Sequence, residues 1–320
     1  MSVLIATEGE PIQPQQGEVP RLVSIVSDTS YTGGSKSDWT LSTPAGVSNP
    51  PVLMIVGGYL GSEFLYTPIA EAAVNADLAV VTMDPPRSQK ADRALNPAHL
   101  THPERLLGQM VRRIVIDLNE SHGVASVHAT GHSMGGPAVI AAAERLPERF
   151  ESVTLWGSAG VSKHGAVLLG SRTPEIIAEA WGGRDQLKNH FAPDVSTALR
   201  SLALCCKYVT LNPIRTASEA LAVSRSDSSH ILKRLRQLGV KTGALAFQDD
   251  PYFRADEVAA KIAGIVDVFK VLSSTGHIAP QLFPELVMKA QSQILKEYEA
   301  DDFYEFGVSS HATTSLRNSK

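Results

Sequence analysis

Short apolar segments alternate with longer amphipathic segments along most of the chain. The apolar segments are residues 52–56, 78–83, 126–130, 152–156, 243–247 and 268–272. Nearly continuous apolar runs of this length are typical of strands buried on both faces of a sheet. The amphipathic segments carry apolar residues at three-and-four spacing, which predicts helices, and they span 63–75, 103–119, 134–147, 254–263 and 283–299. Because strands alternate with helices, we expect an α/β fold with a mostly parallel central sheet and helices on both faces.

Two segments depart from this alternation. Near the N-terminus, RLVSIVSD and WTLSTP flank the Gly/Ser-rich stretch YTGGSKS, which predicts an antiparallel hairpin at one edge of the sheet. From about residue 162 to 238, helical patterns follow one another without a convincing strand, and we interpret this segment as a helical cap over the carboxyl edge of the sheet. The predicted units are an N-terminal arm at 1–20, a core divided between 21–161 and 239–306, the cap at 162–238 and a flexible tail at 307–320.

The composition narrows the class of protein. With 43% hydrophobic and 19% charged residues in 320, the chain can bury a large core. Lys and Arg total 29 against 33 Asp and Glu, without a long run of either sign, so we expect no nucleic-acid partner. No apolar stretch has the length or flanks of a signal peptide or membrane span. The two cysteines, Cys205 and Cys206, are adjacent in the sequence, which favours a reduced, cytoplasmic protein.

The stretch ATGHSMGG at 129–136 lies between a predicted strand and an Ala-rich predicted helix. The pattern Gly-x-Ser-x-Gly in this context is typical of a sharp turn that holds a serine in a strained backbone and exposes its hydroxyl. The N-terminus of the following helix favours negative charge beside that serine. We therefore predict Ser133 as a nucleophile; the alternative is a glycine-rich turn with an incidental serine.

A nucleophilic serine requires a general base and a residue that orients the base. Asp249 and Asp250 directly follow the predicted strand at 243–247, and His277 lies in the loop after the strand at 268–272. Pro251 disfavours helical backbone at the residue before it, so we prefer Asp250 to Asp249 as the orienting residue. His277 is the predicted base, and a solvated loop histidine is the alternative interpretation.

Acyl transfer also requires hydrogen-bond donors for the developing oxyanion. The loop VGGYLGS follows the predicted strand at 52–56 and lies at the same edge of the sheet as the serine. Gly57 and Gly58 allow a close approach of the backbone, and we predict the amides of Tyr59 and Met134 as the two donors. A glycine turn that contacts no ligand is the alternative.

These motifs, together with MDPPRS at 83–88, occur in the order and spacing typical of the α/β-hydrolase superfamily, which the chain resembles from about residue 45 to 300. The resemblance is to its capped serine esterase and lipase branch, and it implies an α/β-hydrolase fold with a helical cap. Family members commonly have His-Gly where this chain has Gly57-Gly58, and Gly-x-Gly-x-Ser where it has residues 85–88. The first difference leaves open how the oxyanion loop is braced.

The sequence favours hydrolysis of a small carboxylic ester, or a related acyl compound, through an acyl-enzyme on Ser133. The same triad also serves carbon–carbon bond hydrolysis and perhydrolysis, and a protein of this fold can instead bind a small ligand with little turnover. We expect a small-molecule substrate, no cofactor and no metal, since His99 and His102 lack further ligands at metal-binding spacing. His132 is interpreted as a packing residue, and the substrate-binding residues and the oligomeric state are not assigned.

Overall fold

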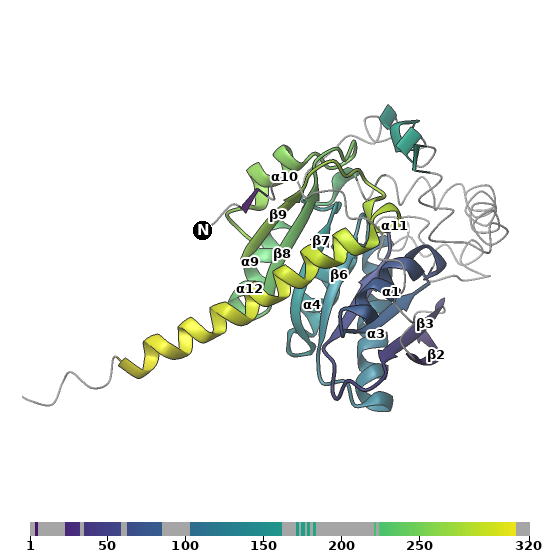
Figure 1. Cartoon of the computed structure of the whole chain (residues 1–320), viewed down its shortest axis with the longest axis vertical. Coiled ribbons are helices and arrows are strands. Elements are labelled where there is room, and N and C mark those ends of the chain that lie inside the picture. Colours follow the sequence, from purple (N-terminus) through teal and green to yellow (C-terminus); the bar gives the residue numbers. More distant parts are fainter. Residues whose placement is uncertain are drawn as a thin grey trace, which may run out of the picture.

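A sheet of nine strands forms the centre of the computed structural model, within the part of the chain that it describes (Figure 1). The strands are β1 (Leu4–Ile5), β2 (Val23–Thr32), β3 (Ser35–Pro44), β4 (Val52–Val56), β5 (Ala79–Met83), β6 (Val127–His132), β7 (Phe150–Trp156), β8 (Lys241–Phe247) and β9 (Val268–Leu272). Their order across the sheet is β1-β9-β8-β7-β6-β4-β5-β3-β2. The structure describes residues 4–5, 23–32, 35–58, 63–84, 103–161, 171–172, 174–176, 178–179, 182–183, 221 and 224–311.

The sheet is mostly parallel, which confirms the predicted fold class. Parallel pairing joins β1 to β9 and runs without interruption from β9 through β8, β7, β6 and β4 to β5. Antiparallel pairing joins β5 to β3 and β3 to β2, so the hairpin predicted near the N-terminus lies at one edge. Its strands are longer than the apolar pattern indicated and pair as far as Thr32 and Ser35. Most of β2 is exposed, and a strand in that position does not need apolar residues.

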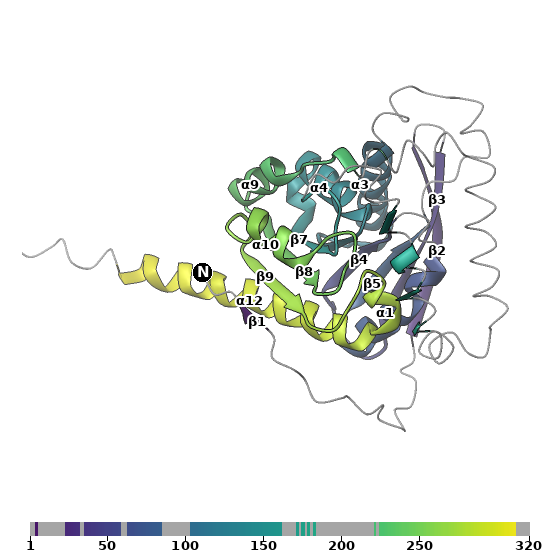
Figure 2. The same cartoon turned by 90° about the horizontal axis from the view of Figure 1, so that it is seen from above.

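Helices pack on both faces of the sheet (Figure 2). In β4, Met54 and Val56 join the core on one face, while Leu53 and Ile55 join the core on the other. The first face is covered by α3 (Pro103–His122), α4 (Gly135–Arg145), α9 (Ser229–Gln237) and α10 (Ala255–Ile262), and the second by α1 (Thr67–Asn75), α11 (Ala279–Leu282) and α12 (Pro284–His311). Burial on both sides explains why the central strands are continuous apolar runs, since each buried Leu or Ile contributes about 1.5–3 kcal/mol.

The two short 3₁₀ helices are η1 (Glu63–Tyr66) and η2 (Pro147–Arg149). The last helix, α12, starts close to its predicted position but continues to His311, past the residue at which the sequence pattern placed a tail, and its far end projects beyond the sheet (Figure 1). In the predicted N-terminal arm, β1 extends the sheet beside β9. Most of the predicted cap at 162–238 lies outside the described residues. Within the described residues, no helix combines the length and apolar character that crossing a membrane requires.

Candidate active site

The predicted functional residues follow the carboxyl ends of neighbouring parallel strands. Ser133 follows β6, Asp250 lies in the loop after β8, and His277 lies in the loop after β9. Gly57 and Gly58 follow β4, which pairs with β6. Because carboxyl ends of parallel strands share one edge of a sheet, four distant segments of the chain meet there.

Ser133 has the strained backbone that the Gly-x-Ser-x-Gly pattern predicts. Its φ angle is 53°, in the left-handed region that few residues other than glycine adopt. The Ser133 N–H donates to the carbonyl of Trp156 (3.2 Å), and the Ser133 carbonyl accepts from the N–H groups of Gly136 (3.2 Å) and Ala159 (3.0 Å). Strain of this kind costs about 1–3 kcal/mol, and these hydrogen bonds on both sides of the peptide hold it in place. A Cβ on Gly131 would lie 2.5 Å from Cα of Gly136, so the strand can turn this sharply into α4 only without that side chain.

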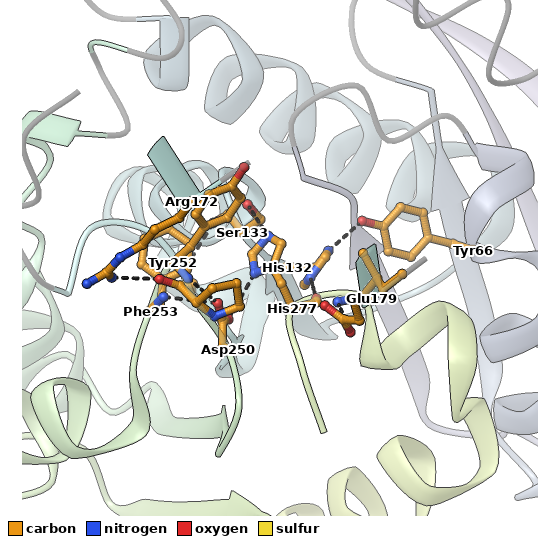
Figure 3. A network of polar contacts seen from close by, with 12 residues as sticks. Tyr66, His132, Ser133, Arg172, Glu179, Asp250, Tyr252, Phe253 and His277 are labelled. Atoms are coloured by element: carbon orange, nitrogen blue, oxygen red, sulfur yellow. Dashed lines mark hydrogen bonds and ion pairs between the residues drawn. The ribbon is translucent and has the colours of Figure 1, made fainter. Parts of the chain in front are cut away.

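One chain of hydrogen bonds joins Ser133, His277 and Asp250 (Figure 3). The Oγ of Ser133 lies 3.2 Å from Nε2 of His277, and Nδ1 of His277 lies 2.9 Å from Oδ2 of Asp250. A carboxylate can only accept, so Nδ1 carries the imidazole proton and Nε2 is free to accept the proton of the serine hydroxyl. The exposed fractions are 8% for Ser133, 6% for His277 and 1% for Asp250, which places the whole chain of bonds out of bulk water.

Of the two neighbouring aspartates, the structure brings Asp250 to the histidine. Its second oxygen, Oδ1, accepts hydrogen bonds from the backbone N–H groups of Tyr252 (2.7 Å) and Phe253 (3.0 Å). These donors fix the carboxylate plane, so that Oδ2 faces His277. The side chain of Asp249 is exposed, and its backbone N–H donates to the carbonyl of Thr275 (2.8 Å).

Aromatic rings surround the imidazole of His277. The ring of Tyr252 lies edge-on with its centroid 5.0 Å away, and the ring of Phe253 is tilted with its centroid 5.6 Å away. The ring of His132 lies on the imidazole as well, with centroids 5.0 Å apart. This packing leaves the imidazole little freedom to rotate away from Ser133 and Asp250.

The two predicted oxyanion donors differ in what the structure describes. Met134 directly follows Ser133 at the N-terminus of α4, where the first amides of a helix lack intrahelical partners. Tyr59 lies outside the described residues. Gly58, the residue before it, is described and approaches the nucleophile so closely that a Cβ there would lie 2.6 Å from Cβ of Ser133.

His132 is more than the packing residue that sequence reasoning assigned. It is 3% exposed, its Nδ1 lies 2.7 Å from the hydroxyl of Tyr66, and its Nε2 lies 2.8 Å from the backbone carbonyl of His277. Burial, with a smaller contribution from the neighbouring imidazole of His277, lowers the pKa of His132 to about 3, so the ring is neutral. Tyr66 is also buried, and this raises the pKa of its hydroxyl. The Gly57-Gly58 pair, which departs from the family pattern, was the one sequence signal that something else braces this loop.

Two residues of the predicted cap segment contact the loops of Asp250 and His277, and no sequence motif pointed to either. Nη1 of Arg172 donates to the carbonyl of Pro251 (2.6 Å), and Oε1 of Glu179 accepts from the N–H of Ile278 (3.1 Å). Burial raises the pKa of Glu179 to about 7. His99 and His102 lie outside the described residues, and within the described part no group of three or more His, Cys, Asp or Glu could hold a metal ion.

Comparison with known proteins supports the same fold. Residues 50–198 match the family model described as the alpha/beta hydrolase fold, whereas no curated protein sequence matches the chain. Among solved structures, a bacterial membrane phospholipase A is similar with a TM-score of 0.60 and 18% identity, covering 87% of each chain. An esterase from Thermogutta terrifontis has a TM-score of 0.58 and 16% identity, covering 86% of this chain and 99% of its own.

A third similar structure is 2-hydroxy-6-oxo-6-phenylhexa-2,4-dienoate hydrolase from Rhodococcus sp. strain RHA1. Its TM-score is 0.57 at 17% identity, and the match covers 87% of this chain and all of that one. At these identities the likeness concerns the fold. The family match over residues 50–198 and the mostly parallel sheet identify the α/β-hydrolase fold.

Proposed function

We propose that the protein is a serine hydrolase that cleaves a small carboxylic ester, or a related acyl compound, through an acyl-enzyme on Ser133. The observation that carries this proposal is the continuous chain of hydrogen bonds from Oγ of Ser133 through His277 to Asp250. It starts at a serine held with positive φ at the N-terminus of a helix, where negative charge is favoured. A core that merely needed to satisfy buried polar groups would have no reason to strain the serine backbone.

In the acylation step, Nε2 of His277 takes the hydroxyl proton while Oγ of Ser133 forms a bond to the carbonyl carbon of the substrate. The electron pair of the carbonyl bond moves to oxygen, and the amide of Met134 donates to this oxyanion together with that of Tyr59. The carboxylate of Asp250 stabilises the imidazolium that forms. The proton on Nε2 then passes to the leaving alcohol as the bond between carbon and that oxygen breaks, which leaves an ester on Ser133.

Deacylation repeats these steps with water as the nucleophile. Nε2 of His277 takes a proton from the water, whose oxygen attacks the acyl carbon, and the proton returns to Oγ of Ser133 as the acid leaves. No redox step and no external cofactor enter this balance. In each step, Nε2 of His277 passes the proton that it takes from the nucleophile to the oxygen of the leaving group.

The same groups suit two other reactions that the sequence left open. Carbon–carbon bond hydrolysis has support from the similar hydrolase from Rhodococcus, whose name specifies a dienoate substrate, and perhydrolysis would use peroxide in place of water. A binding protein with little turnover would need neither the serine strain nor the bond from Ser133 to His277. Catalysis by Ser133 is therefore preferred to simple binding, because it makes direct use of both.

A fluorophosphonate probe tests the nucleophile. We expect the wild type to be labelled at Ser133 and Ser133→Ala to remain unlabelled. Ser152→Ala is the matched control, because Ser152 is another buried serine of the sheet, hydrogen-bonded to His128 on β6, and we expect it to be labelled as the wild type is. Absence of labelling in the wild type, or equal labelling of Ser133→Ala, would overturn the proposal.

A panel of nitrophenyl esters of increasing acyl length then tests the reaction. We expect turnover of at least one ester by the wild type and none above background by Ser133→Ala. If the labelled wild type hydrolyses no ester, the ester assignment is wrong, and the dienoate class becomes the next substrate to measure.

A further inference from the structure

A second chain of hydrogen bonds runs beside the first and links the glycine loop after β4 to the backbone of His277 (Figure 3). The N–H of Gly58 donates to the hydroxyl oxygen of Tyr66 at 2.9 Å. The Tyr66 hydroxyl and Nδ1 of His132 are 2.7 Å apart, and Nε2 of His132 and the carbonyl of His277 are 2.8 Å apart. All of these groups are buried.

Chemistry fixes the direction of every bond in this chain. The Gly58 amide can only donate and the His277 carbonyl can only accept. His132 is neutral, so its single ring proton must be on Nε2 to satisfy that carbonyl, and Nδ1 must accept from the hydroxyl of Tyr66. The side chains of Tyr66 and His132 therefore have one arrangement in which every group is paired, and they do not exchange a proton with Ser133.

The backbone at Gly57 and Gly58 passes between Tyr66 and Ser133. A Cβ on Gly57 would lie 2.5 Å from Cε2 of Tyr66, and a Cβ on Gly58 would lie 2.6 Å from Cβ of Ser133. The loop thus packs against the tyrosine ring on one side and the nucleophile on the other. The hydroxyl of Tyr66 adds a directional bond to this packing and sets the orientation of the peptide at Gly58.

We propose that Tyr66 and His132 are positioning residues that hold the oxyanion loop at a fixed place relative to the loop of His277. The inference rests on the proposed serine hydrolase, because Gly58 directly precedes Tyr59, one of the two proposed oxyanion donors. Rotation of the Gly58 peptide, or a shift of the His277 backbone, changes the distance between the oxyanion donors and the base. The oxyanion donors and the base act on charges that develop only in the transition state. Misplacing either one therefore lowers kcat and leaves KM nearly unchanged.

Tyr66→Phe tests the proposal, because it keeps the ring and removes the hydroxyl. We expect kcat on the best nitrophenyl ester to fall by about 10- to 100-fold, less than the loss of a whole oxyanion donor, with KM within about twofold of the wild type. Tyr298→Phe is the matched control: Tyr298 is an equally buried tyrosine whose hydroxyl lies 3.4 Å from Thr154, in the core on the α12 face. We expect that variant to retain kcat.

A mutant cycle separates positioning from a general loss of stability. If Tyr66 and His132 act through one chain of hydrogen bonds, Tyr66→Phe and His132→Asn lower kcat by similar factors. The kcat of the double variant then lies within about threefold of the kcat of the less active single variant. Independent, multiplying effects would contradict the inference. If Tyr66→Phe does not fold, His132→Asn with its thermal midpoint measured beside kcat decides the question.

The two proposals fail in different ways. Suppose that fluorophosphonate labels Ser133 in the wild type and in Tyr66→Phe with the same rate constant, and that Tyr66→Phe keeps the wild-type kcat. This result would overturn the positioning role and leave the proposed serine hydrolase intact. An equal loss of kcat in Tyr66→Phe and Tyr298→Phe would also overturn it. Failure to label the wild type would instead remove the proposed function on which the inference rests.

Discussion

The Oγ atom of Ser133 lies 3.2 Å from Nε2 of His277, although 144 residues separate them in the sequence. The imidazole keeps this place because Asp250 holds its other nitrogen. Backbone amides in turn hold the carboxylate of Asp250. A change in the carboxylate should therefore act on Ser133 through the orientation of the ring between them.

Asp250→Asn should lower kcat by about 10⁴-fold, because a side-chain amide no longer selects the imidazole tautomer whose Nε2 accepts the serine proton. Asp249→Asn is the matched control, since this neighbouring side chain is exposed, and its kcat should stay near the wild-type value. The measurement is kcat on the nitrophenyl ester that the wild type hydrolyses fastest. Equal losses in the two variants would mean that Asp250 has no special role.

Gly131→Ala should open the turn at Ser133. The new methyl group would meet the backbone of α4, with Cα of Gly136 only 2.5 Å away, and backbone cannot move aside as a flexible side chain can. We expect a loss of about 1–3 kcal/mol in the free energy of unfolding, measured with urea, together with slower fluorophosphonate labelling. Gly264→Ala is the control, because nothing lies within 4 Å of a Cβ there. A stable, fully reactive Gly131→Ala protein would refute this account of the turn.

The raised pKa of Glu179 gives stability a defined dependence on pH. Its ordinary pKa is 4.5, and burial raises it to about 7, so between these values the folded protein holds a proton that the unfolded chain has released. This contribution to stability is fully present below about pH 4.5 and is lost as the pH rises through about 7. His277 and Asp250 are the titratable groups that face this carboxyl, with opposite effects on its pKa.

Glu179→Gln should remove this fall in stability with rising pH, because glutamine has no proton to release. Its amide oxygen can still accept from the N–H of Ile278. We expect the thermal midpoint of the wild type to fall relative to that of the variant between about pH 5 and pH 8. Glu175→Gln, at an exposed position four residues earlier in the sequence, should follow the wild type at every pH. Parallel curves for the wild type and Glu179→Gln would show that the folded and unfolded proteins release this proton over the same pH range, and that burial does not raise the pKa of Glu179.

Gln291→Leu should destabilise the attachment of α12 to the sheet. The side chain of Gln291 is fully buried, its Oε1 accepts from Nε1 of Trp156 (2.9 Å), and its Nε2 donates to Oγ1 of Thr154 (3.3 Å). Leucine fills a similar volume but removes the acceptor of Trp156 Nε1 and one of the two hydrogen-bond partners of Thr154 Oγ1, at a cost of about 1–3 kcal/mol in the free energy of unfolding. Lys289→Ala, at an exposed position of the same helix, should change it little. Urea unfolding measures the free energy of unfolding of both variants. Equal losses in Gln291→Leu and Lys289→Ala would refute the stabilising role of the Gln291 hydrogen bonds.

The sequence could predict the parts of the molecule that depend on local pattern. The apolar runs at 52–56 and 268–272 coincide with β4 and β9, since strands buried on both faces leave a continuous signal. Glycines around Ser133 indicated the turn, and the loops after β8 and β9 supplied Asp250 and His277, which the structure brings together. Their catalytic roles remain predictions.

Other features depend on contacts that no local pattern records. Nothing in the sequence distinguishes His132 from the other histidines as the one that bonds both Tyr66 and the backbone of His277. The bond from Glu179 to Ile278 joins segments 99 residues apart, and the pKa of Glu179 follows from burial that only the folded chain creates. The oxyanion role of Tyr59 and the location inferred from Cys205 and Cys206 also stay predictions, because these residues lie outside the described part.

Strands β7 and β8 are direct neighbours, paired from Ser152 with Lys241 to Trp156 with Leu245, although the whole predicted cap comes between them in the sequence. The entropy of closing a loop grows slowly, by about 0.6 kcal/mol for each doubling of its length. The sheet is therefore largely indifferent to how long the intervening segment is. The length of chain between β7 and α9 can therefore change without altering the pairing of β7 with β8, whereas α9, whose Leu232 and Leu235 are buried against the sheet, belongs to the scaffold that holds Ser133.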